Sequence, residues 1–113
     1  MDTYIRGESI GLKITLTLPS GTVIDLTTLQ TISISVYHSR LGTSLKTGTY
    51  AGGEITYFTD GSDGILEFFI EDGLTALANP GAYDYLITVT ETDTDFDDNT
   101  DTGKQTGTAF YLN

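Results

Sequence analysis

The sequence contains no cysteine and no tryptophan, and it has two prolines and one histidine in 113 residues. Without cysteine the chain forms no disulfide, no thiolate metal site and no cysteine nucleophile, so its stability must come from packing. No segment approaches the about eighteen apolar residues of a membrane-spanning helix, and the first residues lack the apolar stretch of a signal peptide. We therefore expect a protein that is made in the cytoplasm, has no signal peptide and stays soluble.

Basic residues are also scarce. Five lysines and arginines stand against 16 aspartates and glutamates, which gives a formal net charge of −11. The basic residues are scattered along the chain, so no positive patch can form to bind a phosphate backbone. This balance argues against nucleic acid and against an anionic membrane as partners.

What the sequence does contain is a series of short segments that alternate between apolar and polar residues. This period of two is typical of half-buried β-strands. The clearest are residues 10–18 and 31–37, where isoleucine, leucine and valine alternate with threonine and serine. Further strands are predicted at residues 22–24, 55–59, 65–70, 82–90 and 108–112.

The intervening segments carry turn signals rather than long helices. Residues 19–21 (Pro-Ser-Gly) and 60–64 (Asp-Gly-Ser-Asp-Gly) predict tight turns, and residues 71–79 predict one helical turn that ends before Pro80. The polar stretch 38–48 is expected to be a loop that holds one short edge strand. This count favours an all-β fold, a Greek-key sandwich of six or seven strands, with a small barrel as the alternative.

The most unusual segment is acidic and lies between the last two predicted strands. Its candidate metal ligands are Asp93, Asp95, Asp97, Asp98 and Asp101. Calcium takes six to eight oxygens from such loops, but the spacing is not that of an EF-hand, whose sixth residue is glycine and whose twelfth is glutamate. We predict a flexible, solvated loop over residues 91–105 whose carboxylates repel one another. A calcium site is the alternative, and no cofactor is otherwise expected.

No combination of residues predicts a catalytic site. His38 is the only histidine and is followed by Ser39, but adjacent residues of a strand point to opposite faces, and the sequence has no Gly-x-Ser-x-Gly nucleophile motif. Asp60 and Asp63 are expected to belong to an ordinary hairpin turn. The protein is therefore expected not to be an enzyme.

Aromatic residues are plentiful and fit either a core or a binding platform. Tyr83 and Tyr85 alternate, so they share one face of their strand, and we expect them to pack in the core with their hydroxyls at its rim. The aromatic residues considered for a platform are Tyr4, Tyr37, Tyr50, Tyr57, Phe58, Tyr83, Tyr85 and Tyr111.

Two stretches of the sequence resemble known protein modules. Residues 77–89, which include Asn-Pro-Gly-Ala-Tyr, resemble the start of the penultimate strand of immunoglobulin-like sandwiches, where a tyrosine fixes the corner before the strand. Residues 6–8 (Arg-Gly-Glu), the turn at 19–21 and residues 23–27 (Val-Ile-Asp-Leu-Thr) are similar to the immunoglobulin-like module at the N-terminus of tailed-phage baseplate proteins. The chain departs from that pattern in its acidic segment.

The resemblance implies one immunoglobulin-like antiparallel β-sandwich of about seven strands over residues 1–113. It also implies a non-enzymatic structural component of a bacteriophage virion, assembled in the host cytoplasm, such as a baseplate, fibre-anchor or capsid-decorating subunit. Its partners would be other virion proteins, and copies on a symmetric particle would favour a homo-oligomer. The alternative is a carbohydrate-binding or calcium-dependent adhesion module that uses residues 93–101 and nearby tyrosines.

Overall fold

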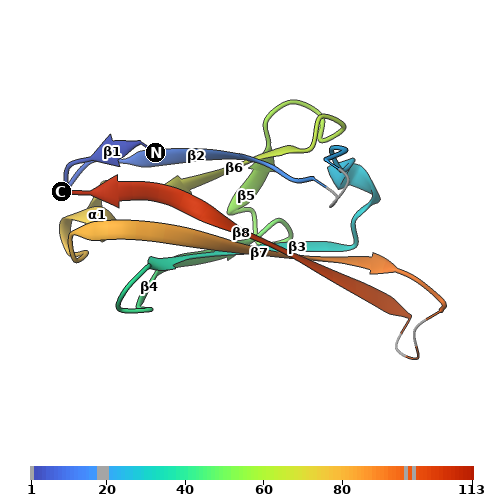
Figure 1. Ribbon diagram of the computed structural model, residues 1–113. Coiled ribbons are helices and arrows are strands. Elements are labelled where there is room, and N and C mark those ends of the chain that lie inside the picture. Colours follow the sequence, from blue (N-terminus) through green and yellow to red (C-terminus); the bar gives the residue numbers. More distant parts are fainter. Residues whose placement is uncertain (1, 18–20, 96, 98) are drawn as a thin grey trace.

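The computed structural model describes residues 2–17, 21–95, 97 and 99–113, and in it two β-sheets pack face to face (Figure 1). Pro19 and Ser20 of the predicted first turn lie outside the described residues. The elements are β1 (Thr3–Tyr4), β2 (Ile10–Thr15), the 3-10 helix η1 (Leu26–Thr28), β3 (Thr31–His38), β4 (Ser44–Thr49), β5 (Ile55–Tyr57), β6 (Ile65–Ile70), α1 (Asp72–Ala76), β7 (Gly81–Thr92) and β8 (Thr100–Leu112).

The order of the strands is that of an immunoglobulin-like sandwich. One sheet has the order β1-β8-β7-β3-β4 and the other the order β2-β6-β5, and every pair is antiparallel except β1 with β8. In immunoglobulin terms, β2, β6 and β5 take the places of strands B, E and D, and β3, β7 and β8 those of C, F and G. The all-β sandwich is thus confirmed, with eight strands where about seven were expected. The barrel alternative is wrong, because the two sheets are separate.

The predicted alternation explains how the sheets form and pack. In β2 and β3 every second residue is buried, and β6 supplies Phe68, one of the largest fully buried side chains of the core. The residues that form one continuous core come from both sheets: Ile10, Leu12, Ile14, Leu16, Leu26, Ile32, Ile34, Val36, Ile55, Leu66, Phe68, Ile70, Tyr83, Ile87, Phe110 and Leu112.

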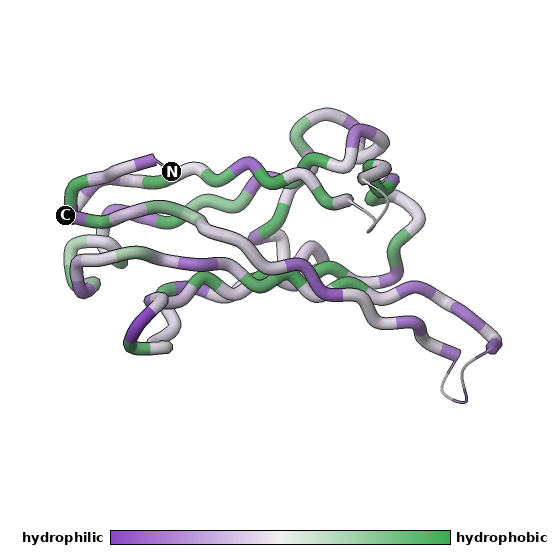
Figure 2. Tube along the Cα trace, in the orientation of Figure 1, coloured by the Kyte–Doolittle hydropathy of each residue, from purple (hydrophilic) through white to green (hydrophobic). Residues whose placement is uncertain are grey.

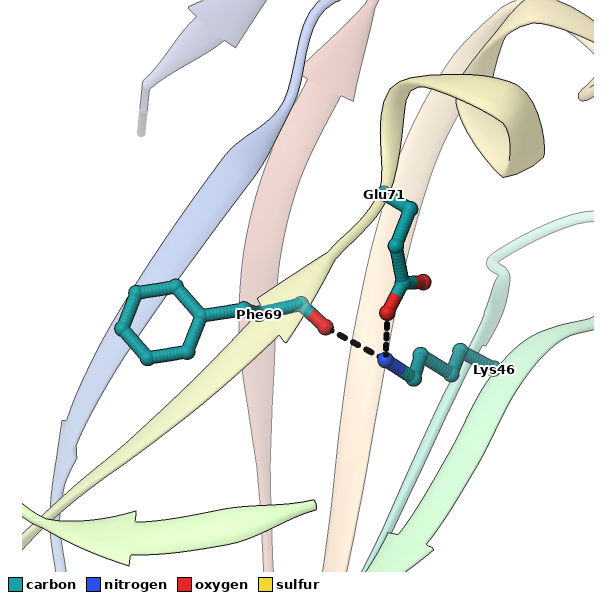
Figure 3. Close-up of polar contacts among 3 residues, drawn as sticks. All are labelled: Lys46, Phe69 and Glu71. Carbon is teal, nitrogen blue, oxygen red and sulfur yellow. Dashed lines mark hydrogen bonds and ion pairs between the residues drawn. The ribbon is translucent and has the colours of Figure 1, made fainter.

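A lysine links the two sheets where a chain with cysteines could use a disulfide. The Nζ of Lys46 on β4 reaches across to the end of β6 (Figure 3). It donates hydrogen bonds to the carbonyl oxygen of Phe69 at 2.7 Å and to Oε1 of Glu71 at 2.6 Å. The Lys46 side chain is 17% exposed, so its stem is largely packed while its charge is paired.

The start of β7 has the tyrosine corner that the sequence predicted. The hydroxyl of Tyr83 donates a 2.7 Å hydrogen bond to the carbonyl oxygen of Asn79, four residues upstream. The ring is buried and stacks on Phe110. Gly81 has a φ of +133°, and a Cβ there would lie 2.7 Å from Nε2 of His38, so this corner requires glycine.

The predicted loop over residues 91–105 is wrong. β7 continues to Thr92 and β8 begins at Thr100, so only residues 93–99 connect them. The two strands form a long hairpin that extends beyond the rest of the sandwich, and its protruding part is largely hydrophilic (Figures 1 and 2). The strand was missed because its inward positions hold Gly103, Gln105 and Gly107, which give no apolar alternation.

The other boundaries follow the sequence more closely. The edge strand expected within residues 38–48 is β4, the strand expected at residues 22–24 is a single bridge between Thr17 and Val23, and α1 is the predicted helical turn. The two-residue strand β1 was not predicted, since two residues are too short for an alternating pattern. Among the described residues no helix is long and apolar enough to cross a membrane.

Candidate docking surface

The acidic candidates lie at the tip of the β7–β8 hairpin. Asp95, Asp97 and Asp101 are exposed, and Asp98 lies outside the described residues. Oδ1 of Asp93 accepts a 3.0 Å hydrogen bond from the backbone N–H of Asp95, which makes it part of the turn. Across the ranges that the structure describes, no three carboxylate or imidazole side chains gather as a metal site would require.

The aspartates of the turn at residues 60–64 are occupied by the turn itself. Oδ1 of Asp60 accepts hydrogen bonds from the hydroxyl of Ser62 at 2.6 Å and from its backbone N–H at 3.0 Å, and these bonds lower the pKa of Asp60. Asp63 accepts from the N–H of Ile65 and from the hydroxyl of Thr59. Both carboxylates therefore hold the hairpin together, as the sequence predicted for this turn.

His38 is a structural residue. It is 4% exposed, and its Nε2 lies 3.0 Å from the carbonyl oxygen of Pro80. Its Nδ1 accepts hydrogen bonds from the backbone N–H groups of Arg40 and Leu41, both at 3.2 Å. These partners fix the neutral tautomer with the proton on Nε2. Both ring nitrogens are thus committed to backbone groups, and neither is placed to take a proton from a substrate.

The broadest uniform surface is the outer face of the five-stranded sheet. Register places side chains of β4, β3, β7 and β8 in ranks across this face, and almost all of them carry a hydroxyl. We call it the hydroxyl face, formed by Thr31, Ser33, Ser35, Tyr37, Ser44, Thr47, Thr49, Thr88, Thr90, Thr102, Thr106 and Thr108, with Asp84, Leu86 and Lys104 between them. Neighbouring ranks on one strand stand about 6.7 Å apart, and neighbouring strands about 4.8 Å apart.

Charge is sparse on the hydroxyl face. Asp84 and Lys104 have opposite signs, and Glu54 lines a hollow of about 290 Å³ near the centre of the face, together with Ser35, Thr47 and Leu86. This is little charge for a chain that carries −11. A surface of low charge meets another macromolecule with less repulsion than the rest of this chain exerts on an acidic partner.

A tyrosine pair borders the hydroxyl face. The rings of Tyr50 and Tyr57 stack with centroids 4.5 Å apart and planes inclined by 9°, and Tyr50 is 44% exposed. Burial raises the pKa of Tyr57, and its hydrogen bond with Tyr50 adds to the rise. A groove of about 510 Å³ runs beside the pair and shares Thr31 and Thr49 with the hydroxyl face.

The structure shows which of the aromatic candidates lie in the core and which lie at the surface. Tyr83 is in the core, and Tyr85 is half-buried beside it, with its hydroxyl accepting a hydrogen bond from Nε2 of Gln105. Tyr50 and Tyr57 come from the end of β4 and from β5, and no sequence pattern joined them. A scan for tyrosines that flank a short glycine-containing turn, here residues 51–54, could have found the pair.

Comparison with known proteins gives no relative for this arrangement: no protein-family model, no curated protein sequence and no solved structure matches the chain.

Proposed function

We propose that this chain is a non-enzymatic structural component of a bacteriophage virion, in a baseplate, fibre-anchor or capsid-decorating position. It docks to other virion proteins through the hydroxyl face. The observation that carries the docking role is the low charge of this face on a chain of net charge −11.

The fold supports the same proposal. The strand order is immunoglobulin-like, and the tyrosine corner at Tyr83 lies where the resemblance to immunoglobulin-like sandwiches expects it. His38 and the aspartates at residues 60–63 are committed to backbone and turn contacts, so their roles are structural. The phage assignment itself rests on the sequence resemblance.

The test is the presence of the chain in purified particles of the phage whose genome encodes it. Mass spectrometry of density-purified particles is expected to find the chain at a fixed ratio to the other structural proteins. Its absence from the particles would refute the virion role, and a gene located among metabolic genes would count against it as well.

A charged side chain introduced by substitution tests whether the hydroxyl face is the docking surface. Thr106→Asp lies beside Leu86 near the centre of the face. It is expected to leave the far-UV circular dichroism spectrum unchanged and to reduce incorporation into particles in a complementation assay. The matched control is Thr56→Asp, an exposed position on the other sheet. Equal incorporation of both variants would show that docking uses another surface.

A second candidate function has its own observation. The stacked Tyr50–Tyr57 pair and its groove present an aromatic surface with hydroxyls at its side, which is the chemistry that binds a sugar ring. In this case the chain is a carbohydrate-binding or adhesion module.

A glycan array with and without calcium separates the two functions. Reproducible binding that Tyr50→Ala abolishes would favour the sugar-binding module. The control is Phe58→Ala, which removes an aromatic ring of similar exposure outside the groove. An array without binding would remove this second candidate.

A further inference from the structure

Two strand edges lie open on the same side of the sandwich. β2 pairs with β6 on one side and forms the edge of its sheet. β8 has β7 on one side, and on its other side β1 pairs with its end alone, at Tyr111 and Leu112. Within the described ranges, no strand pairs with the outer edge of β8 over residues 101–110. Unpaired edges of this length are sites where another strand can add.

One side chain already bridges these edges. Oε1 of Gln105 on β8 accepts a 3.2 Å hydrogen bond from the backbone N–H of Thr17, and its Nε2 donates a 3.0 Å bond to the carbonyl oxygen of Thr15. A side-chain amide thus binds the extended backbone next to β2 through one acceptor and one donor, as the peptide group of a neighbouring strand does. We call the region between residues 11–17 and 103–109 the seam.

Two cavities occupy the seam, one toward each end of this bridge. The first, of about 200 Å³, is mainly apolar and is lined by Leu16, Ile24, Ile87, Val89 and Gly103, with Thr17, Lys104 and Gln105 as its polar residues. The second, of about 250 Å³, is more polar, and its lining includes Asp2, Lys13 and Tyr85. The edges offer hydrogen bonds, and the first cavity offers a place for an apolar side chain.

β1 shows the direction in which the edge of β8 accepts a strand. It runs parallel to β8, and the carbonyl oxygen of Asp2 accepts a 2.8 Å hydrogen bond from the N–H of Tyr111. A segment in line with β1 would continue this ladder along the open part of β8. Its alternate side chains would then point into the seam.

We propose that the seam binds an extended segment of a different protein by strand addition, in line with β1, with one apolar side chain in the cavity beside Gly103. The segment is uncharged, because Lys104 and Lys13 line the two cavities and repel a basic segment, while the chain as a whole carries −11 and repels acidic segments and its own copies. This proposal deepens the proposed docking function by naming a class of partner, an uncharged β-strand.

The experiment uses a displayed library of random nonapeptides selected against the immobilised full chain. Enriched peptides are then synthesised and their dissociation constants measured by fluorescence anisotropy. The selected peptides are expected to carry an apolar residue at one fixed position, with β-branched residues and few charged ones elsewhere.

Gly103→Val is the blocking variant. A Cβ at Gly103 meets only Cγ2 of Val89, at an ordinary contact distance of 3.4 Å, so valine fills the apolar cavity without a clash. Binding is expected to weaken by about tenfold or more, because the peptide loses the pocket for its apolar side chain. The matched control is Thr56→Val, the same substituted residue at an exposed position of β5, outside both the seam and the hydroxyl face, and it is expected to bind like the wild type.

Thermal melting shows whether Gly103→Val folds. This variant is expected to be at least as stable as the wild type. The proposal is overturned if no peptide is enriched, if enriched peptides bind Gly103→Val as tightly as the wild type, or if Thr56→Val is the variant that loses binding. Its failure is distinct from failure of the virion role. Peptide binding without presence in particles would refute the phage role alone, and the reverse result would refute the seam alone.

Discussion

Replacing Tyr83 with phenylalanine isolates the hydrogen bond that fixes the corner before β7. The substitution removes one oxygen atom and keeps the ring, which is 2% exposed and stacked on Phe110. The apolar packing is therefore unchanged, and the 2.7 Å bond to the carbonyl oxygen of Asn79 is the contact that is lost.

The expected cost is about 1 kcal/mol, because a neutral hydrogen bond contributes about 0.5 to 1.5 kcal/mol and Asn79 is exposed, so water can reach its freed carbonyl. For a chain of 113 residues, an unfolding entropy of about 2.1 cal/mol/K per residue turns this cost into a decrease in Tm of about 4 °C.

The assay is urea unfolding followed by circular dichroism. The control is Tyr111→Phe, because Tyr111 is 40% exposed and lies in the pair next to Tyr83 and Phe110 in the same hairpin. A loss below about 0.3 kcal/mol for Tyr83→Phe, or an equal loss for the control, would refute the reasoning, because surface changes normally fall within about 0.5 kcal/mol.

Unfolding at alkaline pH provides a second comparison of the wild type with Tyr83→Phe. Burial raises the pKa of Tyr83 above its usual value of 10.0. The folded protein therefore holds the phenol proton more tightly than the unfolded chain, so this stabilisation is complete below pH 10 and is lost as the pH rises through the folded pKa. Tyr83→Phe is expected to lose less stability in that range, and identical alkaline profiles would contradict this account.

Three other changes have defined outcomes. Gly107→Val is expected to destabilise the protein by about 1 to 3 kcal/mol in urea unfolding, because a Cβ there would lie 2.7 Å from the Tyr85 hydroxyl, whereas Gly103→Val has room and serves as its control. Lys46→Met is expected to lower the Tm. The hydrogen bond to Lys46 lowers the pKa of Glu71, so the ionised carboxylate stabilises the folded wild type, and this stabilisation disappears as the pH falls below 4.5 and the carboxylate is protonated. Lys46→Met lacks this bond, so it should lose less stability in that pH range. Calcium and a chelator are expected to leave the Tm unchanged, and a calcium-induced rise would show that the hairpin tip binds the ion.

The sequence predicted the strands whose inward residues are large and apolar. β2 and β3 alternate isoleucine, leucine and valine with polar residues, and burial follows that alternation residue by residue. The corner at Tyr83 was predictable for a different reason: Pro80 has a fixed φ, and Gly81 can adopt the positive φ of +133° that the corner needs.

β8 shows where this reasoning fails. Gly107 faces inward because the Tyr85 ring lies against it, and Gly103 faces inward opposite Val89. The apolar contact across these positions is supplied by the neighbouring strand, so residues 100–107 of β8 carry no signal of burial, in contrast to residues 108–112 with Phe110 and Leu112. Its threonines also resemble those of a polar loop, and their β-propensity becomes visible only when β7 is there to pair with them.

The surfaces assigned to docking could not be predicted from the sequence at all. The hydroxyl face combines residues from four strands, and its ranks depend on register, which a polar pattern does not determine. The link from Lys46 to Glu71 joins residues that no local pattern connects. In both cases the strands were predictable, and the way they meet was not.

The protruding hairpin implies uneven mobility along a single pair of strands. β3 pairs with β7 as far as Thr90, so the pairs beyond it have neither a third strand nor a core beneath them (Figure 1). Their amide protons should exchange with solvent much faster than those near Ile87, without global unfolding. A molecule that binds to these outer pairs of β7 and β8 must therefore offset the entropy lost when they become ordered, while one that binds over Leu86 contacts a strand that has neighbours on both sides.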